Sequence, residues 1–495
     1  MRPARDTARR SNLAAPPLLA APPATRPPMS TRPWPRFVAE SRSLVRLASP
    51  IILSQVAHVL MGLVDTVMAG QAGAVEQAVV GLGVALWMPV FIGLMSVVQA
   101  VSPVVAHHFG AGDAQGVVAD TREGVWLAGW VSAIPFALMP FVGPLLTAAG
   151  IEATLAQKTS VFLWGIAFGL PAALVFRALA FYSASINHPK PMMFLAFLGL
   201  GINTFFNWVL IHGHFGFPAM GGAGCGWATG IGMWCGLIGL VWWTAVSRDY
   251  RPYYLWRGWT RPTWAGQKRL LRIGLPMGGA GLAEVAAFSS VAVLVGRFGA
   301  VQIAAHQVAL NFAALIFMLP MGLSSALSIR VGQALGAGEV RRARFVAWTG
   351  IGVGLLIATV AIVPMILGRH EIAAVYSNDA SVRQLAATLL LFAAFWQWFD
   401  ATQVCAVGAL RGYKVTFMPM LLMLVAFWGV GIPLGTWLGY RGWPGGEPMQ
   451  VYGFWVGLVA GLVLVSIGLV AALQSVSRTW LEEHRLASAA QGEHA

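Results

Sequence analysis

Twelve long apolar segments constrain what this chain of 495 residues can fold into. Each is close to the roughly 20 residues that a helix needs to cross the hydrocarbon core of a bilayer. We therefore predict an all-α integral membrane protein with 12 transmembrane helices. The predicted spans, with ends uncertain by several residues, are 44–69, 77–104, 122–147, 159–184, 191–213, 223–246, 270–296, 302–328, 345–368, 384–409, 417–439 and 450–475.

Composition agrees with a membrane protein and argues against a nucleic-acid partner. Charged residues make up 10% of the chain, against roughly 25% in an ordinary soluble domain. The net charge of +14 comes from basic residues that lie between the spans rather than along one helix or patch. Cys225, Cys235 and Cys405 have no CxxC spacing, so neither a disulfide framework nor a metal cluster is supported.

The distribution of Lys and Arg predicts the topology. An even number of spans puts both termini on one side, and 26 of the 32 basic residues then share that side with the termini. Five lie on the other side, and Arg177 lies within or near the end of a span. Because short cytoplasmic loops carry an excess of Lys and Arg, we expect a multi-pass protein with both termini in the cytoplasm.

The longest polar connection leaves six spans before it and six after it, so it separates two halves of the chain.

The segment before the first span is rich in Pro, Ala and Arg, and proline interrupts it too often for a signal-peptide core. The sequence does not decide whether translation starts at Met1 or Met29. The predicted organisation is a disordered extension at 1–35, an N-terminal six-helix lobe at 36–246, a cytoplasmic linker at 247–269, a C-terminal six-helix lobe at 270–478 and a cytoplasmic tail at 479–495.

The two halves of the chain repeat. A gapless shift of 226 residues lays Pro50 on Pro276 and Gly70 on Gly296, and it also aligns the motif at 110–112 with the one at 336–338. Six spans per half make such repeats parallel, related by an axis along the membrane normal, as in some transporters. We therefore expect two pseudo-symmetric lobes with a central cleft between them.

Three carboxylates fall deep within the predicted spans, namely Asp65, Glu284 and Asp400. An ionised group at that depth is costly unless it is paired, hydrated or protonated, so we interpret them as functional; the alternative is a structural hydrogen bond to a neighbouring helix. His58 and Met61 lie near the helical face of Asp65. The repeat places His58 opposite Glu284, although packing between helices is the more common role for such a histidine.

Polar and aromatic residues share the faces of the two later carboxylates. Trp396, Gln397 and Gln403 lie within one turn of Asp400, and such a face suits a bound cation or a proton. Phe288 follows Glu284 by one turn, and a ring beside a carboxylate suits a flat organic cation. Aromatic rings in membrane helices more often pack against lipid or neighbouring helices.

Motifs of other function classes are absent from the sequence. There is no Walker A sequence, which argues against ATP as the energy source, and no HExxH. The pair His107 and His108 has no adjacent ligand set, and the serine-rich segment at 322–328 lacks a GxSxG elbow. An intramembrane enzyme is therefore poorly supported.

Three separated motifs point to one family. The stretches LASPIILSQVAHVLMGLVDTVMAG (47–70), AAHQVALNFAALIFMLPMGLSSALSIRVGQALGAG (304–338) and FWQWFDATQVCAVGALRGYK (395–414) occur in order. Together they resemble the multidrug and toxic compound extrusion (MATE) family, in its bacterial NorM-like branch, over about residues 40–475. The chain departs from the family pattern at Val415, where an acidic residue is common, and in NHPKP after the fourth span.

The resemblance implies two six-helix lobes facing each other across a V-shaped cleft in the inner membrane. It implies an antiporter that expels cationic amphiphilic drugs and dyes, driven by inward Na⁺ or H⁺, with no other cofactor. Asp65, Glu284 and Asp400 match the acidic residues of the first, seventh and tenth helices, and Glu284 and Asp400 are the pair associated with the coupling cation, Na⁺ included. We expect a monomer in the lipid bilayer. The alternative is a flippase for lipids or lipid-linked precursors, whose cleft should carry several basic residues.

Overall fold

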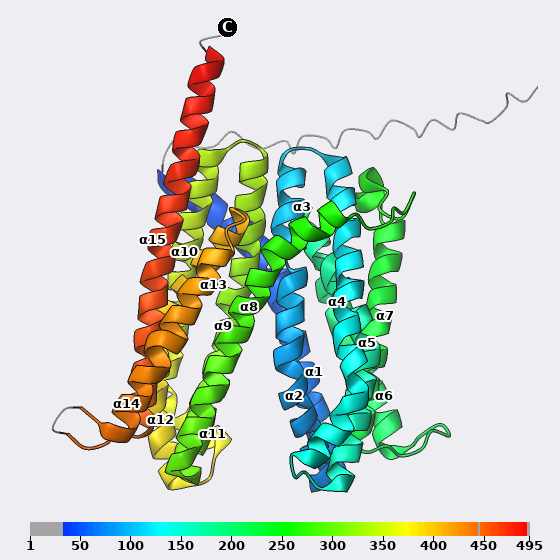
Figure 1. The fold of residues 1–495 in the computed structure, drawn as a ribbon, viewed down its shortest axis with the longest axis vertical. Coiled ribbons are helices and arrows are strands. Elements are labelled where there is room, and N and C mark those ends of the chain that lie inside the picture. Colours follow the sequence, from blue (N-terminus) through cyan, green and yellow to red (C-terminus); the bar gives the residue numbers. More distant parts are fainter. Residues whose placement is uncertain (1–32, 444–445, 493–495) are drawn as a thin grey trace, which may run out of the picture.

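The computed structural model describes residues 33–443 and 446–492, and helices make up most of them (Figure 1). No strand occurs in these two ranges, in agreement with the predicted all-α fold. In chain order the helices are α1 (Pro33–Ala72), α2 (Ala74–Val98), α3 (Val101–Gly110), α4 (Ala114–Ala148), α5 (Ala153–Ser185), α6 (Lys190–His212), α7 (Gly222–Val246), η1 (Arg248–Tyr253), α8 (Trp264–Val295), η2 (Gly296–Phe298), α9 (Ala300–Gly336), α10 (Val340–Leu367), α11 (Arg369–Tyr376), α12 (Ala380–Gly412), α13 (Phe417–Met423), η3 (Leu424–Gly431), α14 (Ile432–Arg441) and α15 (Val451–Gly492).

Twelve helical segments are long and apolar enough to cross a membrane, which confirms the predicted number of spans. The second span combines α2 with α3, and the eleventh combines α13, η3 and α14. Several helices extend well past the predicted ends, as α15 does by continuing to Gly492. Hydropathy locates the part of a helix that suits hydrocarbon, whereas polar residues can prolong the same helix into water.

Helix ends also differ from the predicted segment boundaries. Most of the predicted extension lies outside the described residues, but Pro33–Pro35 already begin α1, because proline is tolerated in the first turn of a helix. Helix α8 begins at Trp264, within the predicted linker. The Thr263 side chain accepts a hydrogen bond from the Gly266 N–H and so caps this helix.

The first helix of each half crosses to the other half. We call 33–246 the N-terminal half and 264–492 the C-terminal half, and the end of the bundle that carries the connection 247–263 is the linker end. Helix α1 starts beside α9 and α10 and packs along α6, whereas α8 starts beside α4 and packs most extensively along α2. In Figure 1 the linker end is uppermost, and α8 runs from there down into the C-terminal half.

Two glycines at the linker end show that the halves meet symmetrically. A Cβ added at Gly110 would collide with the backbone carbonyl of Gln333, and a Cβ added at Gly336 would collide with that of His107. Both pairs of residues are related by the shift of 226. Since only glycine permits so close an approach of two backbones, the repeated motif serves the contact between α3 and α9.

Helix η3 is a π-helix in the middle of the eleventh span. From it, the indole Nε1 of Trp428 donates a hydrogen bond of 3.0 Å to the carbonyl of Ala283, directly before Glu284 on α8. π-Helical turns are rare and often lie at functional sites. This turn fixes the approach of the eleventh span to the α8 carboxylate.

Candidate functional site

A pair of carboxylates lies inside the C-terminal half, one on α8 and one on α12. Asp400 is buried, Glu284 is half-buried, and the two interact electrostatically. Gln403, nearly one turn after Asp400 on α12, donates from Nε2 to Glu284 Oε1 at 3.2 Å. The structure thus brings together three residues that the sequence distributes over two distant spans.

Aromatic rings surround this pair. Phe288 stacks on Trp396 with ring centroids 5.3 Å apart, and Phe427 of the π-helix meets Phe288 edge-on at 5.8 Å. Trp396 also packs edge-on against Trp455 and is buried. The Trp396 side chain also hydrogen-bonds to the Asp400 carboxylate. The half-buried Phe288 keeps part of its surface accessible beside Glu284.

One amide oxygen at this site lacks a partner. Gln403 Oε1 is buried, and no described residue donates a hydrogen bond to it. Leaving a buried acceptor unsatisfied is costly, so the position suits a proton donor or a cation. A protonated carboxyl would supply the donor, and a hard cation would use the amide and carboxylate oxygens as ligands.

The Gln397 side chain bonds to α9 rather than to the carboxylate pair. Its Nε2 donates to the Ala313 carbonyl of α9 at 3.4 Å and so ties α12 to α9.

Among the described residues no group of three or more His, Cys, Asp or Glu could hold a metal ion. The candidate oxygen ligands for a Na⁺ ion in the C-terminal half are those of Glu284 and Asp400 and Gln403 Oε1, which accepts no hydrogen bond from a described residue.

Asp65 lies in a separate polar cluster inside the N-terminal half. Asn207 of α6 donates from Nδ2 to its Oδ1 at 2.5 Å, and Thr229 of α7 donates from Oγ1 to its Oδ2 at 3.3 Å. The carboxylate is 8% exposed. Two hydrogen-bond donors from two other helices therefore hold this side chain in place.

Asn203 completes the cluster by bonding to both neighbours. It donates to Thr229 Oγ1 and accepts from Asn207 Nδ2, each at 3.1 Å. Asn207 Oδ1, like Gln403 Oε1, is buried without a partner in the described part of the chain. Sequence reasoning missed Asn203, Asn207 and Thr229. Two asparagines four residues apart within one apolar span were the available signal.

The expected neighbours of Asp65 do not contact it through hydrogen bonds. His58 Nδ1 lies 2.6 Å from the Ser54 carbonyl of its own helix. Met61 lies near Gly199 of α6. Both share a helix face with Asp65 only approximately, and the donors that reach the carboxylate come from α6 and α7. Within the described residues no hydrogen bond or ion pair links Asp65 to Glu284 or Asp400.

A half-buried cation lies next to the pair in the C-terminal half. Arg411, in the last turn of α12, interacts electrostatically with Glu284 and donates from Nη1 to Gln99 Oε1 at 3.3 Å. Because Gln99 belongs to the N-terminal half, this bond also joins the halves. Sequence reasoning treated Arg411 only as a loop charge.

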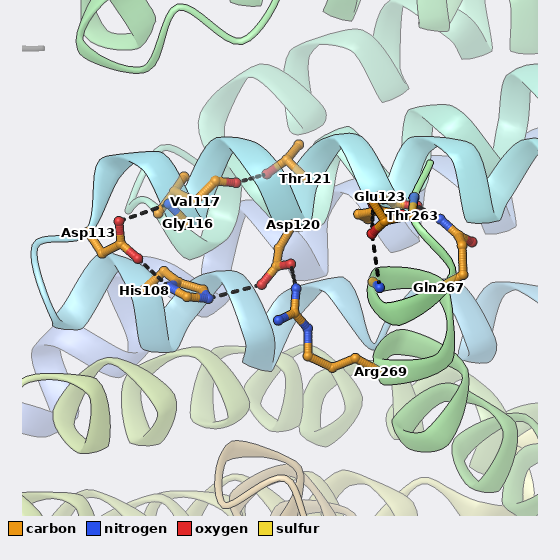
Figure 2. A network of polar contacts seen from close by, with 11 residues as sticks. His108, Asp113, Gly116, Val117, Asp120, Thr121, Glu123, Thr263, Gln267 and Arg269 are labelled. Atoms are coloured by element: carbon orange, nitrogen blue, oxygen red, sulfur yellow. Dashed lines mark hydrogen bonds and ion pairs between the residues drawn. The ribbon is translucent and has the colours of Figure 1, made fainter. Parts of the chain in front are cut away.

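Polar contacts at the linker end join α4 to α8 (Figure 2). Arg269 of α8 forms an ion pair with the buried Asp120 of α4, which also lies 3.0 Å from His108 Nε2. Asp113 lies 2.8 Å from the other ring nitrogen of His108 and caps α4. The backbone N–H of Gly116 lowers the pKa of Asp113 below its ordinary value.

Glu123 forms the second part of this contact. Its Oε1 accepts from the backbone N–H of Thr263 at 2.8 Å and from the Thr263 hydroxyl at 2.7 Å. Gln267 Nε2 donates to the other carboxylate oxygen at 2.5 Å. Every oxygen of this carboxylate is therefore satisfied by the start of α8.

Ion pairs also hold the start of α1 against the C-terminal half, but here the acidic residue lies on the crossing helix. Glu40, near the start of α1, is buried and pairs with Arg330 of α9 and Arg342 of α10. In this crossing the acid lies on the first helix of its half, whereas at the other crossing the base, Arg269, does. In the described residues, every hydrogen bond and ion pair between the halves lies near the linker end.

Comparisons with known proteins identify the family. The MatE family model matches residues 50–209 and again 276–437, two matches that begin 226 residues apart. The chain is 40% identical over 442 residues to the probable multidrug resistance protein NorM of Chromobacterium violaceum, covering 89% of this chain and 95% of that one. It is also 40% identical over 450 residues to the multidrug resistance protein PmpM of Pseudomonas aeruginosa, covering 91% and 94%.

Solved structures share the fold. The eukaryotic MATE transporter AtDTX14 superposes with a TM-score of 0.79 at 19% identity, covering 90% of this chain and 99% of that one. A crystal structure of MATE in the straight conformation gives a TM-score of 0.80 at 18% identity, covering 90% and 97%. With the two sequence matches above, these findings show that the chain belongs to the MatE family, in its bacterial NorM-like branch, and is a membrane transporter rather than an enzyme.

Proposed function

We propose that this transporter is a secondary active multidrug antiporter of the bacterial inner membrane. It exports cationic amphiphilic drugs or dyes in exchange for inward Na⁺ or H⁺. The multidrug role follows its NorM-like relatives. The observation that supports ion coupling is that each half holds a buried amide oxygen, Asn207 Oδ1 or Gln403 Oε1, in a cluster with a membrane carboxylate. Neither oxygen accepts a hydrogen bond from any described residue.

The basic residues support an orientation of the protein in the membrane. The linker end carries the connection between the halves, the start of α1 and the end of α15, and 26 of the 32 Lys and Arg residues belong to this side in the predicted topology. The positive-inside rule therefore supports a cytoplasmic linker end and cytoplasmic termini.

Neutralisation of charge drives the exchange in this proposal. Two neighbouring carboxylates repel each other when both are ionised, so Glu284 and Asp400 favour uptake of one proton or one cation. A cationic drug offers the same relief, with Phe288 as an accessible ring for stacking or cation–π attraction. Drug and coupling ion then compete for one set of charges.

An antiporter also needs two conformations of the helix bundle, and the contacts at the linker end favour one of them. Because the described hydrogen bonds between the halves gather at the linker end, the halves are held together on the proposed cytoplasmic side. Release of drug outward takes place from this state, and the contacts must break before drug can enter from the cytoplasm. A bound ion shifts the equilibrium only if its affinity differs between the two states.

Transport in proteoliposomes tests the proposal. Movement of a fluorescent cationic dye is measured under an imposed pH gradient without Na⁺, and separately under a Na⁺ gradient at equal pH. We expect one gradient to drive dye transport in the wild type, and Glu284→Gln, Asp400→Asn and Asp65→Asn to abolish it. Glu371→Gln removes an exposed carboxylate outside the spans and should transport like the wild type. Wild-type transport by all three variants would refute the carboxylate mechanism.

A further inference from the structure

A pocket at the linker end lies outside the carboxylate clusters. It has a volume of about 910 Å³ and lies between the first half of α8 and the segment 414–418, which joins α12 to α13. On α8 the lining residues include Lys268, Arg272 and Pro276, which are four residues apart and so form one face of the helix.

The pocket is strongly basic. Lys268, Arg269, Arg272 and Lys414 line it, all four are exposed, and no acidic residue is among its lining residues. Arg269 pairs with Asp120, but among the described residues no carboxylate lies within ion-pair distance of the other three. Three cations therefore face one cavity without an ion-pair partner among the described residues.

Lys414 is held in this position by the backbone. It has a left-handed conformation (φ 60°), and its N–H donates to the Arg411 carbonyl at 2.9 Å. Partial burial lowers the pKa of Lys414, Asp120 raises it and the nearby Arg269 lowers it. An anion in the pocket would relieve the repulsion between these cations.

The remaining lining is apolar. Ile273, Pro276, Phe417 and Met418 form part of the wall, and Phe417 and Met418 are 60% and 42% exposed. These residues begin the apolar part of the seventh and eleventh spans. A ligand of this pocket can therefore place a charge among the cations and a hydrocarbon chain against the spans.

We propose that this pocket binds an anionic phospholipid, with the headgroup phosphate among Lys268, Arg272 and Lys414 and an acyl chain along Phe417 and Met418. Basic pockets between membrane helices on the cytoplasmic side favour such headgroups. A phosphate ester free in solution would satisfy the cations but leave the exposed apolar wall unused. The site is distinct from the carboxylate clusters, and lipid binding there does not depend on the proposed drug exchange.

Native mass spectrometry of the detergent-purified full-length protein tests this proposal. Phosphatidylglycerol and phosphatidylcholine with identical acyl chains are titrated separately. We expect tighter binding of phosphatidylglycerol in the wild type. A charge near the membrane surface contributes about 1 kcal/mol, or roughly fivefold in affinity, so Lys268→Gln/Arg272→Gln/Lys414→Gln should lose on the order of 100-fold.

A matched control removes the same charge elsewhere at the linker end. Arg248, Arg251 and Arg341 are exposed and do not line the pocket, so their triple Gln variant should lose less than about threefold. Equal losses in the two triple variants, or equal affinity of the wild type for both lipids, would overturn the proposal. If the pocket triple variant unfolds, Lys414→Gln alone must still weaken phosphatidylglycerol binding by about fivefold.

A competition arm separates a lipid from a soluble anion. Inorganic phosphate is added at millimolar concentration to the complex with phosphatidylglycerol. We expect the lipid to remain bound, because phosphate makes no contact with the apolar wall. Complete displacement at that concentration would show a site for soluble anions and would overturn the assignment to a lipid.

Discussion

At the scale of single residues, the sequence predicted the three membrane carboxylates and also Gln403 and Trp396, which bond to Glu284 and Asp400, but it did not predict the partners of Asp65. A carboxylate in an apolar span is conspicuous because it is costly there. Neutral amides and hydroxyls such as Asn207 and Thr229 carry a weaker signal, and their contact with Asp65 depends on the packing of α1 against α6 and α7. Among the described residues His58 and Met61 form no hydrogen bond with Asp65, and their role beside it stays a prediction.

Asn207→Ala should destabilise the N-terminal half. The substitution removes a buried donor from the Asp65 carboxylate, and bonds to charged groups contribute about 1.5–3 kcal/mol. Thermal unfolding of the purified protein should show a lower Tm. Thr204→Ala on the same helix removes only a bond to its own Leu200 carbonyl and is the control. An unchanged Tm for Asn207→Ala would show that this hydrogen bond is not important for stability.

Gln403→Leu should weaken binding of the coupling ion without preventing folding. The variant loses both the donor to Glu284 and the free Oε1 while keeping a similar volume. Loss of about 1.4 kcal/mol corresponds to a tenfold higher ion concentration for half-maximal transport. Thr402→Val, which only breaks a bond to its own helix, should leave this concentration unchanged. Equal half-maximal concentrations for Gln403→Leu and wild type would contradict the role of this amide.

At the scale of elements, hydropathy predicted the twelve spans well because crossing hydrocarbon requires a continuous apolar length. It did not predict the π-helical turn of η3 or the crossing of α1 and α8 between the halves. Both depend on how helices distant in sequence pack together. The sequence aligned Gly110 with Gly336 as part of the repeat, and the structure shows that both allow close contact between α3 and α9.

Gly110→Ala and Gly336→Ala should each separate α3 from α9. Neither site has room for a methyl group, and overpacking typically costs about 1–3 kcal/mol. Because the two contacts are related by the repeat, we expect similar decreases in Tm. Gly129→Ala has open space and should be neutral or slightly stabilising. A large effect at one site and none at the other would contradict the symmetry of the contact.

At the scale of the whole molecule, the halves share a fold but not a set of charges. The repeat places Glu284 opposite His58 and leaves Asp65 without an acidic counterpart, since Val291 occupies that position. At the linker end the first helix of the N-terminal half, α1, contributes the acidic residue Glu40 to an ion pair. The first helix of the C-terminal half, α8, contributes the basic residue Arg269. The repeat thus predicts the architecture, whereas the individual side chains decide where ions bind and how the halves are held.

Glu40→Gln should open the linker end. Loss of the carboxylate charge leaves Arg330 and Arg342 without their shared ion-pair partner between α1 and the C-terminal half. Maleimide labelling of a cysteine at the buried Ala106, which packs near Gly332, should become several-fold faster. Glu483→Gln, on the exposed end of α15, serves as the control. If Glu40→Gln did not change the labelling rate, this ion pair would not hold the halves together.

The most direct test of the account is the affinity of a cationic dye measured at rising concentrations of the coupling ion. Competition for Glu284 and Asp400 predicts that the dye Kd of the wild type rises in proportion to ion concentration once the ion site begins to fill. In Glu284→Gln/Asp400→Asn the Kd should be higher at the start and should no longer respond to the ion. A wild-type Kd that stays constant over this range would contradict the shared carboxylate site.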